Sequence, residues 1–301
     1  MMTREDIEFA GEGGTTLRGW FYPAAGADGP TATIVMSHGL TAVKEMYLDD
    51  FAAYFAGAGL NALVYDHRNF GASDGTPRQE ADPVMQQRDM RNAISYVSTR
   101  RDVAENRIGL WGTSFAGGIA LVVAAVDRRV KAVVSQVPGT SGFGMAIRAV
   151  RPDLAAQAQQ MLTGDRMNRF TGGEPGIVPA VSADPMGPAM MPDAEAWEWF
   201  TETAKGAPNW RNEVTVRSME MAGEYEPISY VSRISPTPLL MVAAADDVVA
   251  PVSLALDAFE LAKEPKKLVL MRGGHFDAYT GAGFEESASA ARDHFLAHLN
   301  A

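Results

Sequence analysis

The residue with the clearest potential for chemistry is Ser114, which lies in a sharp turn between a predicted strand and a predicted helix. The turn reads GTSFAG over residues 112–117, with the apolar run Ile108–Trp111 before it and the helical run Phe115–Val126 after it. Such a turn strains the backbone at the serine and projects its hydroxyl clear of the sheet. It also brings strand and helix close together, which requires the small residues Gly112 and Ala116 on either side. The pattern predicts that Ser114 is a nucleophile rather than an ordinary turn serine.

The elements that must position this serine alternate between strand and helix. A predicted hairpin, Glu5–Ala10 and Thr16–Tyr22, comes first. The strands expected after it are Ala32–Met36, Leu60–Tyr65, Ile108–Trp111, Val130–Val137, Leu239–Ala244 and Lys267–Met271. The helices expected between and after them are Tyr47–Ala58, Val84–Thr99, Phe115–Val126, Val252–Ala262 and Phe284–Leu299. Continuous apolar strands that alternate with helices are typical of a mostly parallel sheet covered on both faces.

About 100 residues interrupt the alternation, between Pro138 and Pro238. This insertion holds eight of the sixteen methionines and three of the five tryptophans, Trp197, Trp199 and Trp210. We expect residues 139–225 to form a partly helical cap, inserted into an α/β core made of residues 1–138 and 226–301. The alternative is a peripheral decoration with a small core of its own.

The composition excludes several classes of protein. The formal net charge is -11 and no basic patch is visible, which disfavours a nucleic-acid partner. The absence of cysteine excludes disulfides, thiolate metal sites and a cysteine nucleophile. No apolar run reaches the roughly 20 residues that cross a bilayer. The N-terminus has no apolar segment of the kind found in signal peptides, so we expect a cytoplasmic protein.

Four further motifs accompany the serine turn: Ser37-His38-Gly39-Leu40, the loop of residues 66–73, Asp246-Asp247 before Pro251, and Gly273-Gly274-His275. With these motifs the chain resembles an α/β hydrolase. Within that fold it is most similar to the esterase branch that includes dienelactone-hydrolase-like, acetyl-xylan-esterase-like and fungal polyketide-transferase-like proteins. The resemblance covers the whole chain except most of the insertion. It implies the α/β-hydrolase fold with an inserted cap. Because dienelactone hydrolases use a cysteine nucleophile, only the serine branch is open to this chain.

The resemblance implies an oxyanion hole. In the family, the residue after His-Gly and the residue after the nucleophile each donate a backbone N–H to the developing oxyanion, and these positions are Leu40 and Phe115. Fixed donors in a dry site stabilise this negative charge. The loop of residues 66–73 matches the family's Asp-x-Arg-Gly-x-Gly-x-Ser pattern, with Asn69 in place of the first glycine. It is expected to be architectural.

The resemblance also implies the remaining members of a Ser-His-Asp triad. The family carries its acid four residues before the proline, which selects Asp247, with Asp246 as the competitor. His275 stands where the family has its histidine. The chain order Ser114, Asp247, His275 is the one expected for this fold. The carboxylate would hold the imidazole in the correct tautomer, and the imidazole would accept the serine proton.

The other four histidines have competing explanations. His38 belongs to the oxyanion loop and His67 to the architectural loop. His294 and His298 lie four residues apart on the last predicted helix, which could suggest a metal pair. No third ligand is near them in sequence, so we expect a solvated helix face and no metal site.

The predicted function is a serine hydrolase that cleaves a carboxylic ester, lactone or thioester through an acyl-enzyme. No metal or organic cofactor is implied. The partner is expected to be a small, apolar ester-type molecule, because methionines fill irregular apolar pockets; a homodimer is left open. Alternatives on the same triad are an acyl transferase, a carbon–carbon bond hydrolase and a cofactor-free haloperoxidase. A catalytically silent ligand receptor is the alternative from another class.

Overall fold

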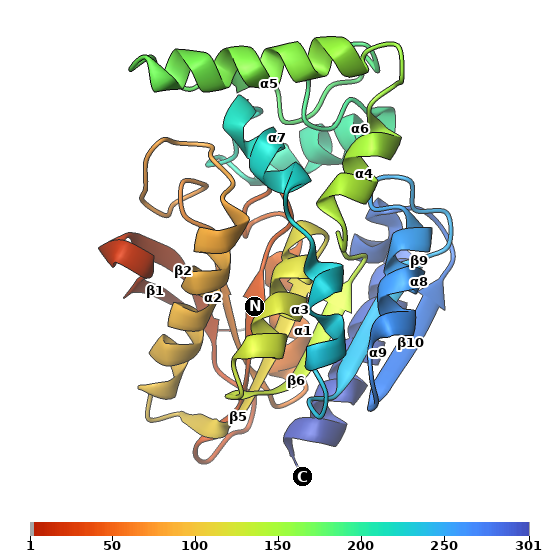
Figure 1. The fold of residues 1–301 in the computed structure, drawn as a ribbon. Coiled ribbons are helices and arrows are strands. Elements are labelled where there is room, and N and C mark those ends of the chain that lie inside the picture. The colour runs from red at the N-terminus through yellow and green to blue at the C-terminus, as the bar shows by residue number, and fades with distance from the viewer. Residues whose placement is uncertain (1–2, 301) are drawn as a thin grey trace.

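The computed structural model describes residues 3–300 and places eight strands in one central sheet (Figure 1). The strand order across the sheet is β1-β2-β4-β3-β5-β6-β9-β10. These strands are β1 (Glu5–Ala10), β2 (Thr16–Tyr22), β3 (Thr31–Ser37), β4 (Asn61–Tyr65), β5 (Val103–Thr113), β6 (Val130–Gln136), β9 (Leu239–Ala244) and β10 (Lys266–Met271).

The sheet is mostly parallel. Strand β3 pairs in parallel with β4 and β5, and β5, β6, β9 and β10 continue in parallel register. Only β2 runs against its neighbours β1 and β4. The carboxyl ends of β3 to β6, β9 and β10 therefore meet at one edge, where loops can bring side chains together. The α/β-hydrolase fold predicted from the sequence is confirmed.

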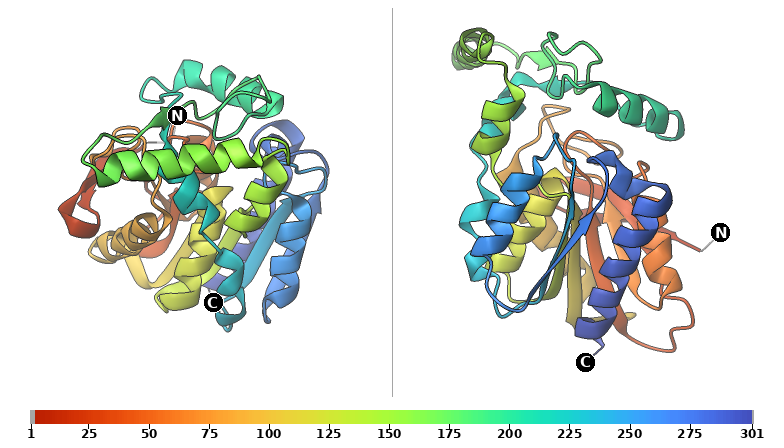
Figure 2. Two further views of the ribbon diagram at one scale, coloured as in Figure 1. Left: turned by 45° about the horizontal axis from the view of Figure 1, so that its top comes forward. Right: turned by 90° about the vertical axis from the view of Figure 1, so that its right-hand side faces the viewer.

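Helices cover both faces of the sheet (Figure 2). One face carries α1 (Leu48–Gly57) and α9 (Gly281–Leu299), and the other carries α2 (Pro83–Ser98), α3 (Phe115–Val126) and α8 (Val252–Leu261). Helix α3 is buried along nearly its whole length because its sequence, FAGGIALVVAAV, has no charged residue. A short 3-10 helix, η1 (Glu12–Gly14), joins β1 to β2.

The segment between β6 and β9 is partly helical and lies above the carboxyl edge of the sheet (Figure 1). Its elements are α4 (Gly142–Ala149), α5 (Ala155–Phe170), β7 (Ile177–Val178), α6 (Ala194–Thr203), η2 (Ala204–Gly206), β8 (Val214–Thr215) and α7 (Val216–Gly223). Strands β7 and β8 pair with each other, and Val178, Val214 and Val216 form a small separate core. Two 3-10 helices, η3 (Pro227–Ser229) and η4 (Val231–Arg233), lead back to β9.

Hydrogen bonds tie this inserted segment to the loop that follows β4. The backbone N–H of Thr215 donates to the carbonyl of Gln79 at 3.0 Å, and the N–H of Ala81 donates to Ser218 Oγ at 2.8 Å. The inserted segment is thus held at both the β6 and the β4 sides of the carboxyl edge. Among the helices described, none is long and apolar enough to cross a membrane.

Candidate active site

Ser114 lies between β5 and α3 in a backbone conformation that side chains rarely adopt. Its φ is 55° and its ψ is -124°. Strain of this kind costs about 1–3 kcal/mol and persists only where the surroundings impose it. Here three backbone hydrogen bonds do so: Ser114 N donates to Gln136 O at 2.8 Å, and Ser114 O accepts from the N–H groups of Gly117 and Gly139, each at 2.9 Å. The turn therefore presents the hydroxyl at the carboxyl edge of the sheet.

The close approach of strand and helix explains the small residues around the serine. A Cβ on Gly112 would lie 2.1 Å from the carbonyl oxygen of Ala116, so no other residue fits there without a shift of the backbone. Ala116 itself is fully buried within the core beneath α3. The methyl group of Ala116 is thus accommodated in the packing.

The structure brings Ser114, His275 and Asp247 together. Ser114 Oγ lies 3.0 Å from His275 Nε2, and His275 Nδ1 lies 2.7 Å from Asp247 Oδ2. The histidine and the aspartate are buried, at 2% and 5% exposure. Asp246, the competing acid, is exposed to solvent. A proton on Nδ1 that is donated to the carboxylate leaves Nε2 free to accept the serine proton.

Asp247 has a second partner that orients its carboxylate. The backbone N–H of Ala250 donates to Asp247 Oδ1 at 2.8 Å, which leaves Oδ2 for the histidine. The loop that carries His275 is shaped by Gly273, whose φ is +94°, and by a hydrogen bond of 2.7 Å from the N–H of Gly274 to Asp277 Oδ2. Each member of the set is therefore held by contacts of its own loop.

The two predicted oxyanion donors lie beside the serine. Leu40, Phe115 and Ser114 line one cavity together. Within residues 3–300, neither the Leu40 N–H nor the Phe115 N–H donates to an acceptor of the protein. Gly39 permits the approach of the Leu40 loop, because a Cβ on it would lie 2.9 Å from Ser114 Cβ. The two N–H groups are therefore available to an oxygen atom bound near Ser114.

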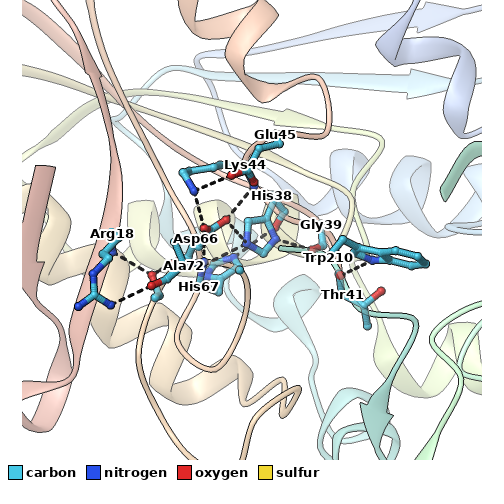
Figure 3. Close-up of polar contacts among 12 residues, drawn as sticks. Arg18, His38, Gly39, Thr41, Lys44, Glu45, Asp66, His67, Ala72 and Trp210 are labelled. Carbon is cyan, nitrogen blue, oxygen red and sulfur yellow. Dashed lines mark hydrogen bonds and ion pairs between the residues drawn. The ribbon is translucent and has the colours of Figure 1, made fainter. Parts of the chain in front are cut away.

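His38 and His67 pack edge to face, with their ring centroids 4.5 Å apart (Figure 3). The N–H of His67 donates to His38 Nε2 at 3.1 Å, so the proton of the His38 ring is on Nδ1, which donates to Gly39 O at 2.9 Å. Burial lowers the pKa of His38 and, more strongly, that of His67. Both rings are thus neutral supports of the loop, in line with the roles expected for them.

A buried ion pair that no sequence motif predicts holds the same loop (Figure 3). Lys44 Nζ lies 2.7 Å from Asp66 Oδ2, and the backbone N–H of Lys44 donates to Asp66 Oδ1 at 2.8 Å. Burial opposes the charge on Lys44, but the neighbouring Asp66 outweighs it and raises the pKa of the lysine. Asn69, which stands where the family has glycine, has a φ of 71°, a conformation that asparagine tolerates better than most residues. No motif in the sequence points to Lys44, because its partner is 22 positions away.

The inserted segment contributes to two cavities at Ser114. The larger has a volume of about 350 Å³ and is mainly apolar, with Met145, Met190, Met191 and Met219 among its lining residues. Of the three tryptophans, Trp199 lines the smaller cavity, beside Ser114 and His275. Trp197 is exposed on α6, and Trp210 donates its indole N–H to Thr41 O at 3.1 Å (Figure 3). The three tryptophans therefore have different roles, which their sequence positions alone do not reveal.

Helix α6 also contacts the loop that carries His275. Trp199 stacks on Phe276 with the ring centroids 4.9 Å apart, and a Cβ on Gly274 would lie 3.0 Å from Glu195 Oε1. Burial, followed by the nearby Asp193, raises the pKa of Glu195. Nothing in the local sequence pattern around Glu195 indicates its contact with a loop 80 residues away.

The expectation of a solvated face for both His294 and His298 is wrong for His294. This residue is 8% exposed, and its Nε2 donates to the carbonyl of Pro238 at 3.3 Å. Burial lowers the pKa of His294 to about 4. Over residues 3–300, no group of three or more His, Asp or Glu side chains is arranged to hold a metal ion.

Comparison with known proteins places the chain in a family. A model of the X-Pro dipeptidyl-peptidase (S15) family matches residues 16–277. The chain belongs to this family of α/β hydrolases. It is 33% identical over 298 residues to a polyketide transferase of Stachybotrys chlorohalonatus, covering 95% of this chain and 94% of that protein. It is 31% identical over 287 residues to a thiohydrolase of Eupenicillium brefeldianum, covering 94% and 90%.

A solved structure agrees with this assignment. The crystal structure of the α/β hydrolase GrgF from a Penicillium species superposes with a TM-score of 0.86 at 31% identity, covering 99% of this α/β hydrolase and 100% of that chain. The predicted resemblance to α/β hydrolases, including polyketide-transferase-like proteins, is confirmed. The family match and these relatives identify the chain as a hydrolase-type protein, and its relatives include a thiohydrolase and polyketide transferases.

Proposed function

We propose that this α/β hydrolase cleaves a carboxylic ester, lactone or thioester through an acyl-enzyme, with Ser114 as nucleophile, His275 as base and Asp247 as the acid that orients the base. The observation that carries the proposal is the continuous chain of contacts from Ser114 Oγ through His275 to Asp247, with lengths of 3.0 Å and 2.7 Å. The position of Ser114 on a strained turn at the carboxyl edge of the sheet supports the same assignment.

In the first step, Ser114 Oγ forms a bond to the acyl carbon while His275 Nε2 takes the hydroxyl proton. The tetrahedral intermediate then collapses: the bond to the leaving oxygen or sulfur breaks, and His275 returns the proton to that group. The Leu40 and Phe115 N–H groups would stabilise the oxyanion, and the loss of one such donor typically costs about 2.7–4 kcal/mol of barrier.

The cavity next to Ser114 suggests the class of acyl group. Its volume of about 350 Å³ is within the usual range for a small-molecule site. Among residues 3–300, Arg148 and Asp193 are the only charged residues that line it, and four methionines give it adaptable apolar walls. Residues 139–225 supply most of these walls, so we assign this inserted segment the role of a cap that covers the acyl group and excludes water.

Acyl transfer to an acceptor other than water is the second candidate, because the relatives include polyketide transferases as well as a thiohydrolase. Both reactions share the acyl-enzyme and differ only in the molecule that releases it. A test of the acyl-enzyme is therefore a test of both candidates.

The proposed function is tested by comparing the wild-type protein with the variant Ser114→Ala. The panel contains p-nitrophenyl esters of increasing chain length, lactones, acyl thioesters and an X-Pro anilide, the last chosen from the family name. We expect wild-type protein to react with a fluorophosphonate probe and to hydrolyse members of the ester and thioester sets. The variant should do neither and should keep the wild-type circular dichroism spectrum. Equal labelling of both proteins, or turnover of the anilide alone, would refute the proposal.

A further inference from the structure

Two cavities of very different size meet at Ser114. The larger, about 350 Å³, is lined by Ser114 and both proposed oxyanion donors, Leu40 and Phe115. The smaller cavity, about 20 Å³, is also lined by Ser114 and Leu40. Of the two cavities, the smaller is lined by His275 and the larger is not. The larger cavity can hold an acyl chain. The smaller one lies where a second reactant would have to give up a proton to His275.

Aromatic side chains form part of the wall of the smaller cavity. Trp199, Phe200, Phe276 and Tyr279 all line it. Trp199 lies at the centre of this cluster. Its ring centroid is 4.9 Å from that of Phe276, 5.1 Å from that of Tyr279 and 4.8 Å from that of Phe200. The indole is half-buried. Replacing it with a smaller side chain would enlarge the cavity.

The size of the smaller cavity decides what it can admit. A cavity holds one water molecule when about 10–15 Å³ of it is open to the centre of a water-sized sphere. By the same measure the smaller cavity has about 20 Å³, so it accepts one water and has no room for a carbon chain. Its lining is mostly apolar.

The release of the acyl group needs a water or alcohol molecule beside His275. Its oxygen forms a bond to the acyl carbon, and its proton passes to His275 Nε2. The bond between that carbon and Ser114 Oγ then breaks, and Ser114 recovers the proton from His275. Water gives a free acid by this route, and an alcohol gives a new ester, with the same atoms and charges balanced in both cases.

We infer that the cavity bounded by Trp199 selects the molecule that releases the acyl group, and that it admits water and excludes larger alcohols. Trp199 is thus a specificity-determining residue, and this chain is a hydrolase rather than an acyl transferase. The inference rests on the proposed acyl-enzyme mechanism and extends it to the second substrate. It assigns to α6 of the inserted segment a function distinct from the walls of the acyl cavity.

The experiment measures how the acyl group is partitioned between water and an alcohol. Wild-type protein, Trp199→Ala and Trp197→Ala are given p-nitrophenyl butyrate with methanol or n-butanol, and the acid and ester products are separated by chromatography. Trp197 is the matched control, because it is on the same helix but is exposed and lines neither cavity. We expect Trp199→Ala to raise the ratio of butyl ester to acid by about tenfold or more, an effect of the size seen when a pocket gains or loses a small group. The control should keep the wild-type ratio.

A conservative variant protects the test against misfolding. Trp199→Phe keeps an aromatic ring against Phe276 and enlarges the cavity less, so it should raise the yield of methyl ester but not that of butyl ester. The inference is overturned if wild-type protein already makes butyl ester as readily as methyl ester, or if neither Trp199 variant changes the ratio more than the control does. Absence of any p-nitrophenol release from wild-type protein would instead refute the proposed acyl-enzyme itself.

Discussion

The substitution Asp247→Asn tests how the acid acts, because the structure dictates how the new amide must turn. The Ala250 N–H donates to Oδ1 at 2.8 Å, so the carbonyl oxygen of the asparagine would have to stay at that position. The NH₂ group then takes the place of Oδ2, 2.7 Å from His275 Nδ1. Facing a donor, Nδ1 becomes the acceptor and the imidazole proton moves to Nε2. His275 can then no longer accept the proton of Ser114.

The expected cost is large although the shape of the side chain hardly changes. Trapping the histidine in the wrong tautomer of a Ser-His-Asp set lowers kcat by about 10⁴, or about 5.5 kcal/mol of barrier. The matched control is Asp246→Asn, which removes the same charge one residue earlier from an exposed side chain.

Steady-state kinetics with a p-nitrophenyl ester distinguish the two variants, and thermal unfolding checks that both are folded. Asp246→Asn should stay within about twofold of wild-type kcat, since a single exposed charge is largely screened. A variant Asp247→Asn that kept a tenth of the wild-type kcat would show that the tautomer argument is wrong. A loss in Asp246→Asn equal to that in Asp247→Asn would transfer the acid role to Asp246.

Two further predictions concern stability. Gly112→Ala should lower the free energy of unfolding in urea by about 1–3 kcal/mol or more, because its Cβ would lie 2.1 Å from Ala116 O. Gly164→Ala, in an open position on α5, should instead raise the free energy of unfolding by about 0.5–1 kcal/mol. Equal effects of the two substitutions would refute the packing argument. Because the folded-state pKa of His294 is lowered from 6.5 to about 4, the unfolded state binds more protons in that interval and stability falls as the pH drops through it. His294→Gln should remove up to about 3 kcal/mol of this pH-dependent loss of stability. A pH profile of urea unfolding that is the same in the variant as in the wild-type protein would contradict this prediction.

The fold was largely predictable because its signals are local. Apolar runs and helical periodicity depend on neighbours in sequence, and the predicted strands and helices of the core agree with the observed ones to within a few residues, apart from an earlier start to β5. The Ser114 turn was readable for the same reason, since the strand, the turn and the helix are consecutive. The choice of Asp247 over Asp246 rested on spacing to a proline within the same loop, and the structure places Asp247 beside His275.

What the sequence could not decide depends on contacts between distant segments. The burial of His294 follows from packing against the end of another loop, and Lys44 finds its partner Asp66 across the sheet edge. The amino-acid sequence by itself determined the alternating α/β core and pointed to the residues that we propose as a triad. Only the tertiary structure decided that Trp199, rather than Trp197 or Trp210, lies beside His275, because which face of an inserted helix meets the core is set by long-range packing and not by local periodicity.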